Sequence, residues 1–451
     1  MTFETTESRR FIFPRQYGQT YPLIVRAEGI RLYDEHGREY IDGSSGAIAV
    51  VSVGHGRREI AETIARQAER MAYVHSAEFQ NLPAEELAAA VARIAPGDLN
   101  RCVFYSGGSE ANEAAVKLAR NYHIVRGAPS KHLTIARRRS FHGATVMTLA
   151  LGEVVGRRGH YAPWYPAVPR IVAPECYRCP LGLRYPDCDL ACARQLEEKI
   201  LEVGPESVSA FIAEPIVGAA APGMTPPEGY YGTIRAICDK YEVVFIADEI
   251  ITGFGRTGRQ FGIEHWDVQP DIAVVGKGIA SGYVPLSGMV ISDRIAQAFW
   301  ETSLPYVHGF THQGHPVACA AGVATLKIIE REGLVVNAAT QGAHLGRRLQ
   351  EIAQRSPIVG DVRGKGLLYG LELVRHKDTR ESFAKSLKVV ERVFRAALEA
   401  GLVIYKGAGH PAAGDEFLVS PPLTVTREDI DDISARLEAA LQVVQEQLAA
   451  A

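Results

Sequence analysis

Short apolar runs alternate with helix-like segments through the middle of this 451-residue chain. The runs are continuously apolar rather than alternating, which is typical of strands in a sheet that is covered on both faces. Strands separated by helices predict right-handed crossovers and a mainly parallel sheet, so the pattern indicates an α/β fold. A helix is expected from Ser109 to about Arg126, directly after the first of these strands. The strands are expected at residues 102–105, 132–136, 210–213, 243–247, 272–275 and 288–291.

The two ends of the chain show different patterns. Residues 29–41 contain a turn sequence between short apolar runs, which predicts a small antiparallel hairpin. Near the other end, Thr426 and Asp429 form a capping-box pattern, and the apolar residues that follow recur at helical spacing as far as Leu448. This segment is expected to be an amphipathic helix that packs on the core. We see no internal repeat and no low-complexity linker.

The composition narrows the class of protein. Hydrophobic residues make up 47% of the chain and charged residues 22%, as in an ordinary globular protein of two or three domains. A net charge of −3 argues against a nucleic-acid-binding or membrane-surface protein. No apolar run approaches the roughly 20 residues that span a bilayer, and the N-terminus does not resemble a signal peptide. An odd number of cysteines, seven, favours a reducing cytoplasmic location.

A glycine-rich corner is the first candidate for chemistry. The sequence Ser-Gly-Gly-Ser-Glu-Ala-Asn-Glu at residues 106–113 lies between the first expected strand and its helix. Backbone N–H groups at such a corner, together with the positive end of a helix dipole, suit a phosphate group. A tight turn with no ligand is the alternative. A Walker-type nucleotide-binding sequence is absent from the chain.

Two ionisable residues follow expected strands. Asp248 comes after the run 243–247, at the strand end where open α/β sheets bind their ligands. A carboxylate among apolar neighbours is costly unless it meets a cation or a protonated ring nitrogen, although it can also simply cap a loop. Lys277 lies between two glycines after the run 272–275, and burial there lowers a lysine pKa and makes the amine a nucleophile. A surface loop is the alternative for Lys277.

Taken together, these motifs resemble those of the class III (omega) aminotransferases, and the resemblance covers nearly the whole chain. It is closest to the branch that acts on amines and omega-amino acids with pyruvate as acceptor. The motifs are Ser-Gly-Gly-Ser-Glu-Ala-Asn-Glu (106–113), Phe-His-Gly (141–143), Ala-Glu-Pro (213–215), Asp-Glu-Ile-Ile-Thr-Gly-Phe-Gly-Arg-Thr-Gly (248–258), Gly-Lys-Gly (276–278), Gly-Phe-Thr-x2-Gly-His-Pro (309–316) and Gly-Asp…Ser-Pro-Pro-Leu (414–423).

The resemblance implies a fold and an activity. The fold is the aspartate aminotransferase-like fold (fold type I), with a large, mostly parallel pyridoxal-phosphate-binding domain over residues 66–328. A smaller α+β domain then comprises residues 1–65 and 329–451. The activity is amino transfer from an amine or omega-amino compound to an α-keto acid, by a ping-pong mechanism with pyridoxal 5′-phosphate. An aminomutase, racemase or decarboxylase on the same fold is the alternative, and a non-catalytic scaffold is disfavoured because Lys277 and Asp248 are both present. The expected assembly is a homodimer or a tetramer.

The resemblance also assigns roles to residues. It implies that Lys277 forms the Schiff base with the cofactor and then moves the substrate proton, and that Asp248 keeps the pyridine nitrogen protonated. Phe141 and Ile250 are expected on opposite faces of the ring, and Thr311 reaches the phosphate of the neighbouring subunit. The remaining cofactor-binding residues are Gly107, Gly108, Ser109, His142 and Glu214.

The chain departs from the family pattern around the substrate. Many members carry an arginine shortly before the Gly-Asp segment that binds a substrate carboxylate, but residues 405–415 contain none. Lys406 is the nearest cation, and Glu214 loses the arginine partner that it has in some relatives. Ile251 stands where several amino-acid-specific members have glutamine, and residues 46–49 replace a large aromatic wall. These changes predict an apolar amine or omega-amino donor.

Clustered cysteines and histidines are the last candidates. Cys176-x2-Cys179 and Cys188-x3-Cys192 have spacings that can hold zinc or an iron–sulfur cluster, with reduced thiols or local disulfides as the alternative. No catalytic metal is expected. Three further residues have ligand-like spacing but belong to a segment that the family uses for cofactor and dimer contacts, which favours interface hydrogen bonding: His308, His312 and His315.

Overall fold

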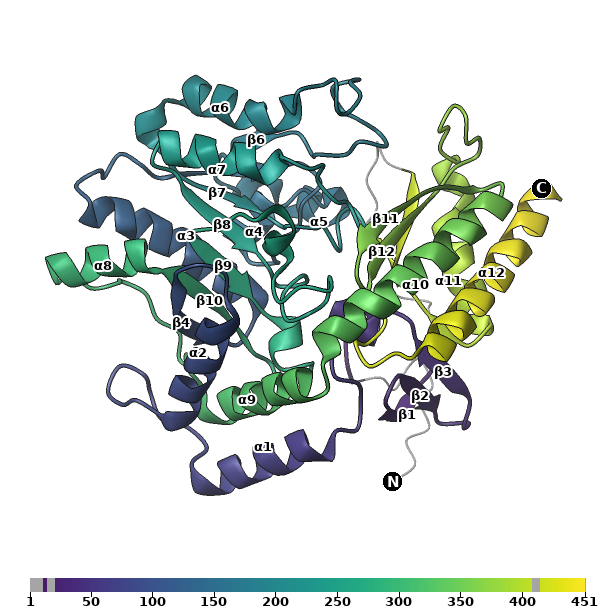
Figure 1. The fold of residues 1–451 in the computed structure, drawn as a ribbon, viewed down its shortest axis with the longest axis horizontal. Coiled ribbons are helices and arrows are strands. Elements are labelled where there is room, and N and C mark those ends of the chain that lie inside the picture. Colours follow the sequence, from purple (N-terminus) through teal and green to yellow (C-terminus); the bar gives the residue numbers. More distant parts are fainter. Residues whose placement is uncertain (1–10, 14–20, 408–413, 451) are drawn as a thin grey trace.

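Seven strands form the central sheet of the computed structural model, which describes residues 11–13, 21–407 and 414–450. Figure 1 shows this sheet on the left, with the two smaller sheets on the right. Strand β10 runs antiparallel to both of its neighbours, and the other neighbouring strands pair in parallel. In spatial order the strands are β4 (Leu99–Tyr105), β10 (Ser287–Ser292), β9 (Ile272–Val275), β8 (Val244–Asp248), β7 (Val208–Ala213), β5 (Leu133–Arg137) and β6 (Arg170–Ile171).

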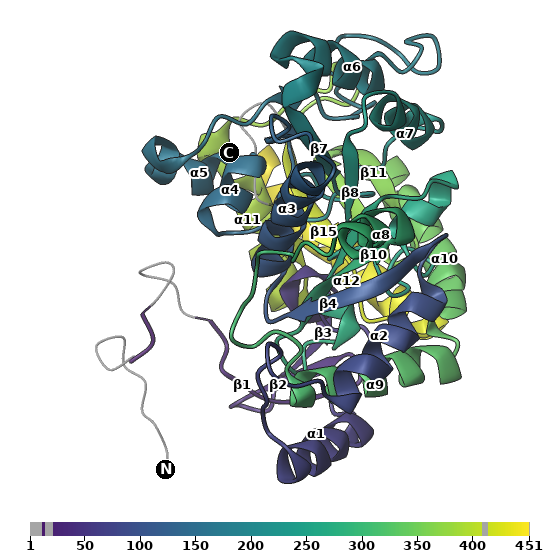
Figure 2. The same cartoon turned by 90° about the vertical axis from the view of Figure 1, so that its left-hand side faces the viewer.

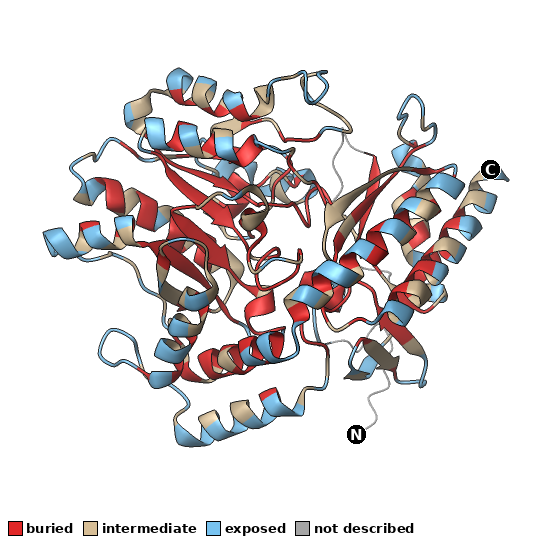
Figure 3. Cartoon of the chain, viewed as in Figure 1, coloured by how far each residue is buried: buried red, intermediate tan, exposed pale blue. Residues whose placement is uncertain are grey.

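Helices cover both faces of the central sheet. On one face, Ile246 of β8 packs in a hydrophobic cluster with α3 (Gly108–Val125). On the other face, its neighbour Phe245 packs with α7 (Tyr230–Lys240). Buried strands with apolar residues on both faces account for the continuous apolar runs in the sequence (Figure 3). The other helices around this sheet are α1 (Arg58–Arg70), α2 (Leu82–Ile94), α4 (Val146–Leu151), α5 (Val155–Arg158), α6 (Ala191–Val203), α8 (Asp293–Thr302) and α9 (Pro316–Arg331).

Two four-stranded sheets and three α-helices complete the fold of the described residues. Strand β3 pairs in parallel with β13, so the two halves of the chain meet in one of these sheets. The first sheet contains β1 (Ile24–Glu28), β2 (Arg31–Asp34), β3 (Glu39–Asp42) and β13 (Leu402–Val403). The second contains β11 (Val359–Lys365), β12 (Leu368–Leu373), β15 (Asp415–Val419) and β14 (Tyr405–Lys406). The helices are α10 (Leu334–Arg355), α11 (Val389–Glu399) and α12 (Arg427–Ala449). The division into 66–328 and the two flanking segments stays a prediction.

The local sequence signals correspond to elements of the structure. Each expected strand overlaps an observed one, and the expected hairpin is the antiparallel pair β2 and β3. At the start of α12, the Thr426 hydroxyl accepts a hydrogen bond from the Asp429 N–H at 3.1 Å, and the Asp429 carboxylate accepts one from the Thr426 N–H at 2.9 Å. Within the described residues, none of the helices combines the length and the apolar character needed to cross a membrane.

The capping box is expected to contribute to the stability of the protein. Replacing Thr426 by alanine leaves the Asp429 N–H without its acceptor and is expected to lower the free energy of unfolding by about 1 kcal/mol. Urea unfolding followed by circular dichroism measures this change. Thr426→Ser keeps the hydroxyl and is the control; an equal loss in both variants would show that the cap is not the source.

Candidate active site

Lys277 lies in a strained turn at the end of β9. Its backbone has φ +42°, in the left-handed region that bulky side chains rarely adopt, and such strain is concentrated at functional sites. The residue as a whole is half-buried, but its amine is desolvated, which lowers the amine pKa to about 8 against the opposing effects of the Asp248 and Glu214 carboxylates. A lysine with this pKa has a substantial unprotonated, nucleophilic fraction near neutral pH.

Asp248 ends β8, the strand next to β9, so its side chain and Lys277 lie at the same edge of the sheet. The carboxylate is 4% exposed and accepts hydrogen bonds on one oxygen from His142 Nδ1 at 2.8 Å and Asn112 Nδ2 at 2.9 Å. Its other oxygen accepts from the Ile250 N–H at 3.2 Å. Asn112 also donates to the His142 carbonyl at 2.7 Å, which ties α3 to the Phe-His-Gly segment. These bonds fix the carboxylate in one orientation.

The glycine-rich corner connects β4 to α3. The Glu110 carboxylate accepts from the Ser106 and Gly107 N–H groups, both at 3.1 Å, and so holds the turn. The Ser109 hydroxyl accepts from the Ala144 N–H at 3.0 Å. Gly143 must be glycine because its φ is +146° and an added Cβ would lie 2.6 Å from Ser109 Oγ. An added Cβ on Gly107 would meet nothing within 4 Å, so this side of the turn is open.

Phe141 and Ile250 lie close to these groups. The ring of Phe141 packs on an apolar cluster that includes Val154 and Val217. Ile250 lies against the glycine-rich turn, since its Cδ1 atom is 2.7 Å from the place of an added Cβ on Gly108. The structure therefore brings Ile250 next to both the expected phosphate corner and the end of β8.

Glu214 is a buried acid without a cationic side-chain partner among the described residues. Its carboxylate accepts from the Phe141 N–H at 2.9 Å and from the Gly218 N–H at 3.3 Å. Burial raises the pKa of this carboxyl group. Its backbone carbonyl accepts from Arg137 and from the Tyr231 hydroxyl, both at 2.6 Å, so the residue is rigidly placed.

Thr311 is the predicted site residue that the structure leaves apart. It is exposed, and its carbonyl accepts a hydrogen bond from the Tyr73 hydroxyl at 2.5 Å. Within the described part of the chain, no contact joins Thr311 to Lys277 or Asp248. Its predicted role requires a second subunit, so a single chain does not test it.

Comparison with known proteins decides the family. The family described as Aminotransferase class-III matches residues 12–441. This chain belongs to the class-III aminotransferases. It is 37% identical to the putrescine–pyruvate aminotransferase of Pseudomonas aeruginosa, over 91% of this chain and 88% of the relative. It is 39% identical to the diaminobutyrate–2-oxoglutarate transaminase of Halomonas elongata, over 94% of this chain and 91% of the relative.

A solved structure extends this relation to the fold. The crystal structure of the omega transaminase from Pseudomonas jessenii in complex with PMP superposes with a TM-score of 0.90 at 31% identity, covering 97% of each chain. Class-III aminotransferases depend on pyridoxal 5′-phosphate, and this chain has the fold-type I architecture. The residues present fit that cofactor. The desolvated amine of Lys277, the buried carboxylate of Asp248 and the open glycine turn before α3 lie at the same edge of the central sheet.

Two residues that the sequence predicts on the substrate side lie together. Ala49 and Ile251 belong to one small apolar cluster, so one of the residues 46–49 lies beside the position where several relatives are expected to have glutamine. Lys406 points elsewhere: its amine lies 5.1 Å from the ring centroid of Phe394 on α11. Lys406, the cation closest in sequence to the place where the arginine is missing, therefore lies on β14 with its amine against α11.

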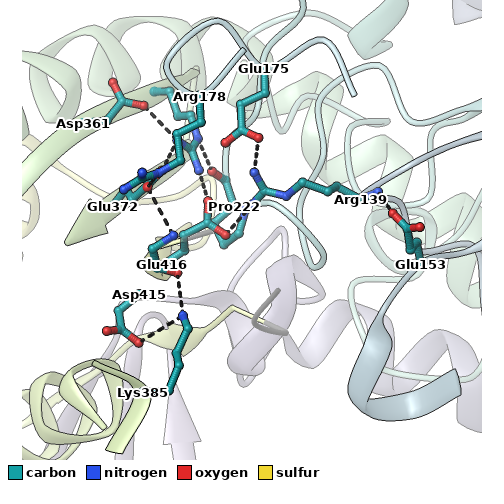
Figure 4. Close-up of polar contacts among 12 residues, drawn as sticks. Arg139, Glu153, Glu175, Arg178, Pro222, Asp361, Glu372, Lys385, Asp415 and Glu416 are labelled. Atoms are coloured by element: carbon teal, nitrogen blue, oxygen red, sulfur yellow. Dashed lines mark hydrogen bonds and ion pairs between the residues drawn. The ribbon is translucent and has the colours of Figure 1, made fainter. Parts of the chain in front are cut away.

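A buried ion network connects the central sheet region to β11, β12 and β15 (Figure 4). Oxygen atoms of Glu175, Glu372 and Glu416 lie within 4.8 Å of one another, an arrangement that can hold a metal ion. Guanidinium groups take the cationic positions here instead. The pairs are Arg139 with Glu175 and Glu416, Arg178 with Glu372, and Arg363 with Asp361, Glu372 and Glu416.

The four clustered cysteines are free thiols, with Cys192 on the first turn of α6. Burial raises the pKa of Cys192 to about 11, and the three other thiols of the group act in the same direction. Within the described residues, no three of the sulfur atoms converge within 4.8 Å. The structure thus shows neither disulfides nor a preformed metal geometry in this segment. His308, His312 and His315 make aromatic contacts with neighbouring rings.

Asn112 and Arg137 are two buried residues at the candidate site to which the sequence assigned no role. Asn112 lies within the quoted glycine-rich motif, and a polar residue on the buried face of a helix is the signal that points to it. Arg137 ends β5, where an arginine after an apolar strand gives no clue to the carbonyl that it binds.

The lowered pKa of Lys277 predicts how its amine titrates. In cofactor-free protein, the rate of its reaction with a small aldehyde, trapped by borohydride, is expected to rise with pH and level off above about pH 8, because only the unprotonated amine reacts. Peptide mass spectrometry follows the labelling. Lys240 is the internal control, since its bond to Glu197 raises its pKa above 10.5 and its labelling continues to rise. Parallel curves for the two lysines would contradict the burial argument.

Proposed function

We propose that this class-III aminotransferase moves an amino group from an apolar amine or omega-amino compound to an α-keto acid, pyruvate in the simplest case, by a ping-pong mechanism. The observation that carries the proposal is that the desolvated Lys277 amine and the hydrogen-bonded Asp248 carboxylate lie at the same edge of the sheet. When bound, pyridoxal 5′-phosphate supplies an aldehyde that captures amines and a protonated ring that withdraws electrons.

In this proposal, Lys277 holds the cofactor through its amine and, once released, takes the proton from the substrate Cα. Its low pKa suits both tasks, because the neutral amine is at once the nucleophile and the base. Asp248 holds the proton on the pyridine nitrogen. Asn112 and His142 orient that carboxylate, since both donate to the same oxygen.

The remaining predicted residues bind and shield the cofactor. Gly107, Gly108 and Ser109 hold the phosphate at the N-terminus of α3, where the helix dipole favours a negative charge. Phe141 and Ile250 cover the two faces of the ring and exclude water. His142 and Glu214 hold the surrounding loops in place.

The donor class rests on the apolar region around Ala49 and Ile251 and on one named relative. An apolar wall favours uncharged alkyl or aryl groups over an amino-acid carboxylate. The Pseudomonas aeruginosa relative uses a diamine with pyruvate, and we extend a related donor and the pyruvate acceptor to this chain. The Halomonas elongata relative uses 2-oxoglutarate, so the acceptor is the part that most needs a test.

We further propose a homodimer as the smallest working unit, because Thr311 lies on an exposed segment away from Lys277, as a residue that serves a partner subunit would. Analytical ultracentrifugation at micromolar concentration is expected to give twice the 49.1 kDa chain mass. The cytoplasmic location stays a prediction from cysteine usage.

A panel of amines and keto acids tests the reaction. With an apolar primary amine and pyruvate, the protein loaded with pyridoxal phosphate is expected to form alanine and the corresponding carbonyl compound in equal amounts. Liquid chromatography of both products measures this. Lys277→Ala is expected to lower kcat by at least about a thousandfold, since it removes the base.

Asp248→Asn tests the role of the carboxylate separately from the role of the Lys277 amine. It leaves the lysine in place and is expected to lower kcat by a similar order while the protein still takes up pyridoxal phosphate. Strict dependence on glutamate with 2-oxoglutarate would overturn the amine proposal, and a racemised or rearranged product in place of alanine would overturn amino transfer.

A further inference from the structure

The turn that carries Lys277, here called the lysine turn (residues 277–283), is strained at a second residue. Ser281 has φ +52°, and Lys277 itself has φ +42°. Both values fall in the left-handed region, which residues other than glycine rarely adopt. The Ala280 N–H donates to the Lys277 carbonyl at 3.3 Å, so the two strained residues belong to one continuous turn. Such a turn keeps its shape only where neighbouring segments hold it.

The hydroxyl of Ser281 holds the lysine turn against a segment from the other end of the chain. Its oxygen accepts hydrogen bonds from the Ser52 N–H at 2.8 Å and from the Val53 N–H at 3.0 Å. In return, the Ser52 hydroxyl donates to the carbonyl of Gly278, the residue after Lys277, at 3.2 Å. Ser281 and Ser52 are each only 2% exposed, so water does not compete for these bonds.

The Tyr283 hydroxyl adds two more bonds between the same segments. It accepts from the Arg57 N–H at 2.7 Å and donates to the Gly54 carbonyl at 3.0 Å. These partners belong to the N-terminal segment (residues 45–57), which leads to α1, the lowest helix in Figure 2. The lysine turn and the N-terminal segment are therefore joined by a continuous set of hydrogen bonds.

The N-terminal segment is itself fixed to the protein at its other end. The Ser45 hydroxyl donates to the Ser420 carbonyl at 2.6 Å and accepts from Arg256 Nη2 at 3.1 Å. Between these bonds and the lysine turn, Ala49 packs in the apolar cluster that contains Ile251. The segment that holds the lysine turn is thus anchored, and the same segment forms part of the expected substrate side.

We infer that Ser281 is a positioning residue for the reaction, whose hydroxyl keeps the lysine turn against the N-terminal segment and so holds the Lys277 amine in place for proton transfer. It acts through the backbone of the turn. Without this oxygen, two buried N–H groups lose their acceptor, and the strained backbone relaxes toward an ordinary conformation. The inference rests on the proposed amino transfer and names the contact on which the placement of its base depends.

The donor half-reaction of the holoenzyme tests the inference. It is followed by stopped-flow absorbance of the bound cofactor after mixing with an apolar amine alone. In Ser281→Ala the limiting rate is expected to fall about 10- to 100-fold, because a small displacement of the base slows proton transfer steeply. The amine concentration that gives half the limiting rate should stay within about threefold, since the substrate wall is intact. Ser52→Ala removes only the bond to the Gly278 carbonyl and should lower the limiting rate by a smaller factor, about 3- to 10-fold.

Ser434→Ala is the matched control. Ser434 is also a fully buried serine, and its hydroxyl donates to the Ile430 carbonyl on α12 at 2.7 Å. The variant loses a buried hydroxyl away from the lysine turn, so its limiting rate should stay within about twofold of the wild type.

Hydrogen exchange gives a second readout that needs neither cofactor nor turnover. In Ser281→Ala, peptides that contain the Ser52 and Val53 amides, and the peptide 276–283, are expected to exchange at least about tenfold faster by mass spectrometry, whereas Ser434→Ala leaves them unchanged. Unchanged exchange in Ser281→Ala, an unchanged limiting rate, or an equal fall in the Ser434 variant would overturn the assignment. If the wild type converts no amine, the proposed function fails, and the exchange of these peptides still decides whether Ser281 holds the lysine turn.

Discussion

Burial of an amine and a carboxylate at the ends of two neighbouring strands is the constraint on which the rest of the site depends. Lys277 and Asp248 lose most of their hydration, and desolvation is what lowers the lysine pKa to about 8. The fold keeps the Asp248 carboxylate in place with three hydrogen bonds from α3, the Phe-His-Gly segment and its own loop. A protonated ring nitrogen in this apolar environment would depend on the Asp248 carboxylate, because burial alone disfavours a charge.

The rest of the molecule positions this pair. Parallel pairing of β8 with β9 sets the two residues at one edge, and the glycine-rich turn before α3 brings Asn112 under the carboxylate. The buried ion network through Arg139 joins the segment that precedes Phe141 to β15. Three carboxylates so close together are tolerable only because arginines lie between them, since removing one partner from such a cluster costs several kcal/mol.

Much of this was predictable because it is local in the sequence. The run 243–247 followed by Asp248 became a buried strand with an acid at its carboxyl end, and the Thr426 and Asp429 pattern became a true capping box. Contacts between distant segments could not be predicted from local sequence. The antiparallel direction of β10, the bond from Asn112 to Asp248 and the bond from Arg137 to the Glu214 carbonyl depend on how separated segments meet, and residue spacing carries no information about that.

The protonation state of the cofactor nitrogen tests the central claim most directly. With pyridoxal phosphate labelled with ¹⁵N in its ring, the nitrogen chemical shift in the wild-type protein at pH 8 should be that of a protonated pyridine. In Asp248→Ala it should move to the value of the neutral ring, because the paired carboxylate is gone. A neutral nitrogen in the wild type, or the same shift in both proteins, would contradict the account.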